Sequence, residues 1–207
     1  MTTAATLLAD LNDRINDVSN AQVTEATKIL YLNDGMRAMW PKIYRTVQDV
    51  SQVLAVDDYE YTIPTASDYG HVVRVDVESG IATNIYSPLQ DYEIYNLMAG
   101  KVIRLKSVPA PYGARFRVTS VVPLTDFATS ASVYDGPPNT LELPVWYALG
   151  IVASRRVEDR LDHKRYSTTA SNNGVDPQEM MNVSQFAFAQ FEMLLDRFQM
   201  PLLPEGG

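Results

Sequence analysis

Cysteine is absent from the 207-residue chain, and histidine occurs only twice. Without a thiol, the chain has no disulfide, no thiolate metal ligand and no cysteine nucleophile. The longest apolar run, residues 145–153, has nine residues, whereas a helix that crosses a bilayer needs about 20. The N-terminus shows no basic leader followed by an apolar block, so we expect no secretory signal. These absences predict a protein that is made in a cytoplasm and has no membrane partner.

Positive charge is also scarce. The chain has 17 Lys and Arg residues against 25 Asp and Glu, which gives a net charge of −8. Tight binding of nucleic acid needs a basic surface, because phosphate neutralisation and counterion release supply most of the affinity. We therefore expect that the chain does not bind DNA tightly, although this charge would not prevent DNA from passing it. Because 46% of the residues are hydrophobic, the chain can nevertheless bury a sizeable core.

Catalytic and nucleotide-binding motifs are missing from the sequence. His71 and His163 stand outside any GxSxG, HExxH or HxH pattern, and neither GxGxxG nor GxxxxGK[ST] occurs. We therefore predict that the protein is not an enzyme and has no catalytic residue and no cofactor. A hydrolase that uses Asp57 and Asp58 is an alternative, but adjacent strand positions point to opposite faces and make a poor catalytic pair.

One acidic cluster has the spacing of a metal site. On a helix, Asp159 would share a face with His163, and Glu158 would share a face with Asp162. Five basic residues are interleaved with this cluster, so ion pairs between residues four apart explain it without a metal. We therefore expect a solvated, charged helix face and no metal. The basic residues are Arg155, Arg156, Arg160, Lys164 and Arg165.

Apolar spacing predicts two helices in the N-terminal part. The first runs over about 3–18, and the second over about 22–47 with Pro41 as a kink or interruption. The first helix has its apolar residues at helical intervals, at Leu7, Leu8, Leu11, Ile15 and Val18.

From Val50 onward, alternating and β-branched segments predict a small antiparallel β-region with one wetted face. A short helix is predicted within 88–98, and residues 124–143 are predicted to form a loop. The predicted strands are 53–56, 59–63, 71–78, 102–106 and 115–122.

Two more helices are predicted in the C-terminal part. Pro144 suits the first turn of a third helix, and Asp176-Pro177-Gln178-Glu179 suits the start of a fourth that runs to about Met200. The predicted fold class is α+β: a helical bundle, made of an N-terminal hairpin and two C-terminal helices, with an inserted small antiparallel β-region. Its predicted parts are a helical core domain (1–49 and 144–200), a β-rich insertion (50–143) and an extended C-terminal tail (201–207).

The fourth helix has apolar residues on two sides. Phe186, Met193 and Met200 lie outside its main apolar face and are spaced by seven residues. Such a second seam favours packing against another helix, either from a neighbouring subunit or from the same chain. The chain also has twelve tyrosines, a residue type that is enriched at protein interfaces. The main face, predicted to be core, comprises Met180, Val183, Phe188, Phe191, Leu194, Leu195 and Phe198.

The order of these parts resembles a known family. A helical hairpin with ATKILYLNDGMRAMW leads into a β-region with VDDYEYTIP. It is followed by LPVWYALGIVASRRVEDRLDHKRY and by a last helix that ends in QFEMLLDRFQMPL. This layout is similar to that of the head-to-tail adaptors (connector or head-completion proteins) of tailed bacteriophages, and the similarity covers most of the chain.

The resemblance implies a structural virion protein in the neck of the phage. Such a protein forms a homo-oligomeric ring of about twelve copies under the portal, joins the capsid to the tail and lines the channel for genome packaging and ejection. Its implied partners are other copies, the portal protein, a downstream tail or stopper (nozzle) protein, and double-stranded DNA as non-specific passing cargo. C-terminal segments would reach the portal, which makes Phe186, Met193, Met200, Pro201, Leu202 and Leu203 the predicted interface.

Two other functions stay open at the level of sequence. One is a different neck or tail-completion role in a phage, with the same absence of chemistry. The other is a carbohydrate- or ligand-binding module that uses the tyrosine-rich β-region.

Overall fold

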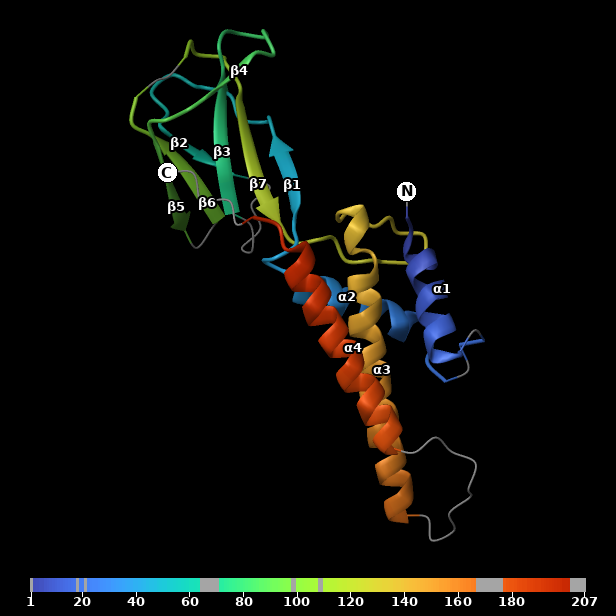
Figure 1. Ribbon diagram of the computed structural model, residues 1–207. Coiled ribbons are helices and arrows are strands. Elements are labelled where there is room, and N and C mark those ends of the chain that lie inside the picture. Colours follow the sequence, from blue (N-terminus) through green and yellow to red (C-terminus); the bar gives the residue numbers. More distant parts are fainter. Residues whose placement is uncertain are drawn as a thin grey trace. The chain divides into compact units, whose positions relative to one another are not determined.

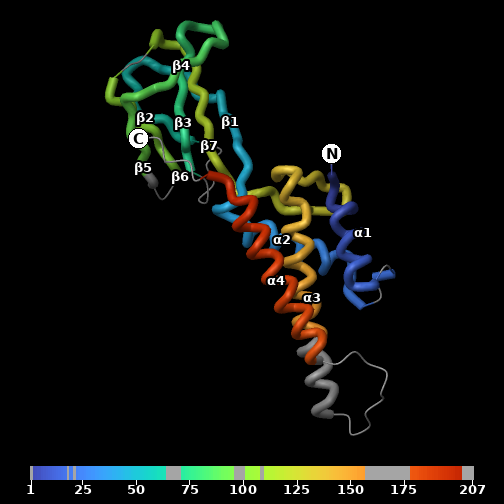
Figure 2. Tube along the Cα trace, viewed as in Figure 1, coloured from blue at the N-terminus to red at the C-terminus, as the bar shows by residue number. Residues whose placement is uncertain are grey.

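The computed structural model has an α+β fold, with four α-helices and two antiparallel sheets in the part of the chain it describes (Figures 1 and 2). It describes residues 2–17, 19–20, 22–63, 71–97, 100–107, 110–166 and 177–201, without the side chains of 96, 97, 100, 157–166 and 177.

Contacts divide the chain into two compact units. The helical unit comprises residues 1–43 and 124–200, and the β unit comprises residues 44–123 with the residues from 201 onward. The sequence predicts these boundaries between residues 49 and 50 and between residues 143 and 144. Residues 45–49 belong with the sheet because they pair with strand 116–122. Residues 124–143 belong with the helices because Ala4 and Ala5 donate backbone hydrogen bonds to Ser132 and Ser130.

Helix α1 (Ala4–Ile15) forms as its apolar spacing predicts. Leu7, Leu8, Leu11 and Ile15 are all buried, and the helix ends at Asn16, which has a left-handed backbone (φ 53°). Asparagine tolerates this conformation better than most residues. The predicted extension to Val18 reaches a residue outside the described ranges.

Helix α2 (Glu25–Met39) is shorter than predicted. It begins at Thr24, whose hydroxyl accepts a hydrogen bond from the Thr27 N–H at 3.3 Å. It ends before Trp40, because a residue that precedes proline disfavours the helical conformation, and Pro41 follows directly. The prediction of helix up to residue 47 was therefore wrong. The segment Arg45–Asp49 forms strand β1 instead.

Helix α3 (Glu142–Tyr166) packs against α1, α2 and α4. Two glycines allow two of these contacts to be close. A Cβ atom on Gly35 of α2 would lie 2.9 Å from the Pro144 Cα, and one on Gly150 of α3 would lie 2.8 Å from the Phe188 ring. Any larger residue would push the helices apart.

Helix α4 (Pro177–Phe198) covers one side of α3 with a face that includes Ala187, Phe191 and Leu195. The proposed start at Pro177 is correct, while Asp176 and the polar segment before it lie outside the described residues. The buried hydrophobic residues of the helical unit form one cluster, which comprises residues from α1, α2, α3, α4 and the 124–143 segment.

A buried ion pair holds the start of α2 to the end of α1. The Lys28 side chain is fully buried, and its Nζ donates to Asn12 Oδ1 (2.6 Å), Asn20 Oδ1 (2.8 Å) and the Asp17 carbonyl (3.0 Å). It also pairs with the Asp17 carboxylate at 3.0 Å. The same carboxylate accepts the backbone N–H groups of Gln22 and Val23. Burial alone would raise the pKa of Asp17, but the hydrogen bonds from Lys28 and these backbone groups outweigh it and lower the pKa to about 2.

The β unit contains a four-stranded sheet of order β1-β7-β3-β4 and a three-stranded sheet of order β2-β6-β5, with every pair antiparallel. Side chains on the facing sides of the sheets form the core of the unit, which includes Tyr61, Val72, Ile103, Phe116 and Val118. The strands other than β1 are β2 (Glu60–Thr62), β3 (His71–Glu78), β4 (Tyr86–Pro88), β5 (Tyr92–Leu97), β6 (Gly100–Leu105) and β7 (Phe116–Val122).

Two predictions for this region were wrong. The short helix expected within 88–98 is strand β5, which pairs with β6 from Tyr92↔Leu105 to Leu97↔Gly100. Pairing with a neighbouring strand here outweighs a weak local helical spacing. The strand expected over 53–56 contributes only an isolated bridge between Val53 and Arg115. The predicted strands 71–78, 102–106 and 115–122 correspond to β3, β6 and β7.

Lys28→Met is expected to destabilise the helical unit by about 3–5 kcal/mol, because it leaves the Asp17 carboxylate buried without its cation. Urea unfolding, followed by the helical circular dichroism signal, measures the effect. Lys42→Met is the matched control, since Lys42 pairs with Asp196 at an exposed position and such pairs contribute at most about 1 kcal/mol. Equal losses in the two variants would contradict the role given to Lys28.

The stability of the helical unit is expected to fall in acid through Asp17. Its pKa is about 2 when folded and 3.8 ordinarily, so its contribution is complete above the ordinary value and is lost as the pH falls towards 2. A protonated Asp17 resembles asparagine. The stability difference between the native chain and Asp17→Asn should therefore shrink between about pH 5 and about pH 2. A difference that stays constant over this range would refute the assignment.

Candidate interaction surface

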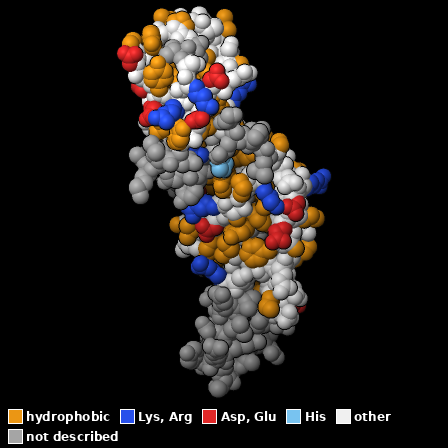
Figure 3. Space-filling model, turned by 90° about the vertical axis from the view of Figure 1, so that its left-hand side faces the viewer, with side chains coloured by type: hydrophobic (Ala, Val, Ile, Leu, Met, Phe, Trp, Pro, Cys, Tyr) orange, Lys and Arg blue, Asp and Glu red, His pale blue; other side chains and the backbone are white. Residues whose placement is uncertain are grey.

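Helix α4 presents exposed apolar side chains outside the face that makes its core contacts. Val183, Phe186 and Met193, here called the outer stripe, are 44%, 56% and 53% exposed. Phe186 and Met193 are seven residues apart, and at 100° per residue they lie within about 20° of each other on the helix surface. Figure 3, viewed from the side on which α4 lies in Figure 1, shows hydrophobic side chains gathered over the helical unit. Part of the exposed apolar surface is therefore gathered over the helical unit.

Phe186 is fixed by an aromatic contact at its inner edge. Its ring meets Trp146 of α3 edge-on, with 5.8 Å between the ring centroids and an interplanar angle of 79°. The Arg14 guanidinium lies over the same Trp146 ring, 4.2 Å from its centroid, and it pairs with Asp10 at 2.8 Å. Edge-on aromatic pairs and cation–π contacts hold rings in defined positions. Phe186 is thus a half-exposed aromatic residue that is already oriented, as anchors of protein interfaces commonly are.

The six predicted interface residues have different surroundings. Phe186 and Met193 are exposed, as an interface requires. Met200 instead packs partly against the helical core, and its N–H donates to the Lys42 carbonyl at 2.8 Å. Pro201 is exposed, and its carbonyl accepts a hydrogen bond from the Tyr44 hydroxyl at 2.8 Å. Leu202 and Leu203 lie outside the described residues.

Sequence reasoning missed three contributors to this surface. Val183 was assigned to the core face of α4 but is 44% exposed, because it lies at the edge of that face, where Ser184 is buried in its place. Trp146 and Arg14 gave no signal of their own. Their link to Phe186 depends on how α1, α3 and α4 pack, which no local pattern encodes.

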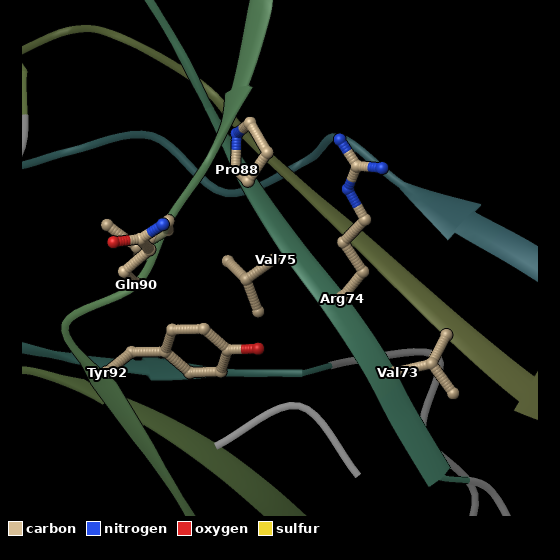
Figure 4. Close-up of a pocket in the computed structure, with 7 residues that line it drawn as sticks. Val73, Arg74, Val75, Pro88, Gln90 and Tyr92 are labelled. Carbon is tan, nitrogen blue, oxygen red and sulfur yellow. The ribbon is translucent and has the colours of Figure 1, made fainter. Parts of the chain in front are cut away.

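The β unit has a pocket of about 380 Å³ where the chain after β4 separates from β3 (Figure 4). Val75 and Tyr92 point into it, whereas Arg74 leaves β3 on the opposite side (Figure 4). Burial raises the pKa of the Tyr92 hydroxyl, although a hydrogen bond from the Val75 backbone opposes the change. The phenol therefore stays protonated at neutral pH and cannot act as a base. The lining residues are Val73, Arg74, Val75, Pro88, Leu89, Gln90 and Tyr92.

The residues considered for chemistry do not converge in the described part of the chain. No group of three or more His, Cys, Asp or Glu side chains there could hold a metal ion. The side chains of Glu158, Asp159, Asp162 and His163 lie outside the described set. Asp57 and Asp58 are exposed turn residues, and Asp58 Oδ1 accepts the Glu60 N–H at 3.1 Å. His71 is exposed at the start of β3.

A helix long and apolar enough to cross a membrane was not found among the described residues.

Comparison with known proteins gives no relative from which to transfer a function. No protein-family model matches the chain, and no curated protein matches its sequence at a significant level. The surfaces themselves therefore carry the functional argument.

Phe186→Ala is expected to cost about 1 kcal/mol or less in the isolated protein, because a half-exposed ring loses mainly its edge contact with Trp146. The control is Phe191→Ala, at a position that is 6% exposed on the same helix, where truncation should cost about 3–5 kcal/mol. Urea unfolding measures both. If Phe186→Ala also lowered the free energy of unfolding by about 3–5 kcal/mol, Phe186 would belong to the chain's own core and not to an interface.

Proposed function

We propose that this chain is a structural virion protein, a head-to-tail adaptor that forms a ring of about twelve copies under the portal of a tailed phage. In that role it joins the capsid to the tail and lines the channel for DNA. The ring would stand in the neck of the virion and contact the portal on one side and a tail or stopper (nozzle) protein on the other. The arrangement of the four helices as one bundle with an inserted β-region, as in that family, is part of the same proposal.

The outer stripe of α4 is the observation that carries this proposal. Monomeric proteins rarely expose contiguous apolar patches unless a partner covers them. Phe186 and Met193 are each more than half exposed and lie on one line of a helix of 22 residues. A surface of this length and character fits a helix or groove of another copy. Covering it would also shield Phe186, whose ring is already oriented by Trp146.

The order of parts supports the same role. The chain leaves the end of α4 at Pro201, where the Tyr44 hydroxyl binds its carbonyl. The residues after Pro201 lie outside the described ranges, and we propose that they contact the portal. The overall charge of −8 is consistent with a channel wall that does not hold phosphates tightly.

A binding module for carbohydrates or other ligands is the second candidate. The pocket of about 380 Å³ in the β unit favours it, since that volume lies within the usual range for small-ligand sites. The two functions differ in the assembly they need, so the state of association separates them.

Met193→Glu is expected to abolish ring formation on the cognate portal, because a carboxylate in the outer stripe cannot be buried without a partner. Negative-stain images of the purified chain mixed with portal report the coaxial rings. Met181→Glu is the matched control: it makes the same change on the same helix at a position that is 43% exposed but turned by about 120° from Met193. Rings that persist in Met193→Glu, or a native chain that stays monomeric on the portal and binds glycans, would refute the proposal.

A further inference from the structure

A buried carboxylate in the β unit holds two arginines side by side. Asp76 of β3 is 1% exposed, and its Oδ2 accepts two hydrogen bonds from Arg117 of β7, from Nε at 3.1 Å and Nη2 at 2.9 Å. Its Oδ1 accepts one from Arg74 Nε at 2.6 Å. The two guanidinium groups therefore bind the same carboxylate, one group on each oxygen. One negative charge compensates one guanidinium, so the trio carries a net charge of +1.

The exposed part of this trio is positive. The Arg74 side chain is 53% exposed and that of Arg117 is 28% exposed, while the carboxylate between them is closed to solvent. Arg74 uses only Nε on Asp76, and none of the described contacts engages its two Nη groups. Arg117 is also fixed by stacking on the Tyr86 ring, with 4.6 Å from Cζ to the ring centroid. The geometry thus presents unused guanidinium donors in fixed positions.

The strand register extends this basic surface along one face of the four-stranded sheet. Asp76 pairs with Arg117, and Arg74 pairs with Thr119, so these side chains share the face opposite to the core residue Val118. Arg115 lies two residues before Arg117 on the same face and is exposed. The neighbouring carboxylate, Glu78, is fully buried, and its oxygens accept the backbone N–H groups of Asn84 and Arg115 at 2.6 and 3.3 Å.

Neutral donors complete the same row. Gln48 of β1 pairs with Thr119 of β7, and Thr119 in turn pairs with Arg74. An amide, a hydroxyl and a guanidinium therefore stand on three adjacent strands, each strand about 4.8 Å from the next. In a protein of net charge −8, this is a local site with the opposite sign.

We infer that Arg74 and Arg117, positioned by Asp76, form a binding site for a phosphate group on this face of the sheet. Guanidinium groups bind phosphate oxygens through two parallel N–H donors, which explains the use of arginine at both positions. A phosphate oxyanion would relieve the repulsion between two guanidinium groups that share one carboxylate. This inference goes beyond the proposed function, and it holds for the chain whether or not rings form.

A purely structural role explains the Asp76–Arg117 pair but not Arg74. Arg117 alone gives Asp76 a doubly hydrogen-bonded partner, which is what a buried carboxylate needs. Arg74 adds a second positive charge whose side chain is half exposed. Removal of Arg74 should therefore leave the Asp76–Arg117 pair and the fold intact while it removes the excess charge.

The test is a titration of the full-length chain with inorganic phosphate, followed by backbone amide NMR shifts at constant ionic strength. Saturable shifts are expected around residues 71–76 and 117–119, and Arg74→Gln should weaken this binding by at least about tenfold, the loss of one charge-assisted contact. Arg104→Gln is the matched control, because Arg104 is 52% exposed and paired with Glu60 on the other sheet and changes the net charge equally. Arg74→Lys keeps the positive charge but lacks the two parallel N–H donors of a guanidinium group, so it should bind phosphate with intermediate strength.

A second arm identifies the source of the phosphate. A short DNA duplex replaces inorganic phosphate, and its affinity is measured at several salt concentrations. If the phosphodiester backbone is the ligand, the duplex should shift the same amides, bind weakly, and lose affinity steeply as salt rises. Shifts with inorganic phosphate alone would assign the site to a free phosphoryl compound.

Three outcomes would overturn the inference. The first is the absence of saturable shifts with either probe. The second is an equal loss in Arg74→Gln and Arg104→Gln, which would mean diffuse charge and no site. The third is equal shifts with chloride and with phosphate, which would mean screening only. Matching thermal unfolding of the variants confirms that a loss of binding does not come from a loss of fold.

Discussion

The close approach of α3 to its neighbours is the constraint on which the helical unit depends. Gly35 lets Pro144 of α3 come against α2, and Gly150 lets the Phe188 ring of α4 come against α3. On α4, the buried residues Ala187, Phe191 and Leu195 lie on one side of the helix. Apolar residues outside that side keep about half of their surface exposed, and they form the outer stripe.

Buried charges shape the surfaces of both units. In the helical unit, Lys28 and Asp17 satisfy each other inside the structure and leave no charge outside. In the β unit, Asp76 and Glu78 are buried by arginines and backbone N–H groups. Burial of a carboxylate is costly unless donors surround it, so each one fixes several groups around it. The net charge of the chain consequently says little about the sign of any one face.

The sequence predicted elements best where the apolar periodicity was long. Helices α1 and α4 and strand β3 follow directly from their apolar spacing. The failures have a common cause in tertiary pairing. The helix predicted to continue to about residue 47 gives way to β1, which pairs with β7, and the short helix predicted within 88–98 is strand β5, which pairs with β6. In both places a partner distant in sequence decides the conformation, and a local window contains no trace of it.

The candidate surfaces were predictable to different degrees for the same reason. Spacing by seven residues identified Phe186 and Met193, because a single helix determines which of its residues share a side. Trp146 and Arg14 could not be found in this way, since three helices bring them to Phe186. The pairing of Arg74 with Arg117 was still harder to predict from the sequence. Arg74 and Arg117 are 43 positions apart, and a bulge between Val72 and Arg74 shifts the register that aligns them.

The bulge also explains how an acidic chain can have a basic site, because it determines on which side of the sheet Arg74 lies. An extra residue at Val73 reverses which side of β3 faces the core. Without it, Arg74 and Asp76 would share a side with Val72 and point into the apolar core between the sheets. With it, Val75 and Val77 enter the core and the charged residues turn outward. The total charge of −8 therefore does not exclude a local site for phosphate groups, because it does not describe the charge of this one face of the sheet. An acidic chain can therefore still contact phosphates weakly at one place, because screening confines each charge to about 8–10 Å at physiological salt.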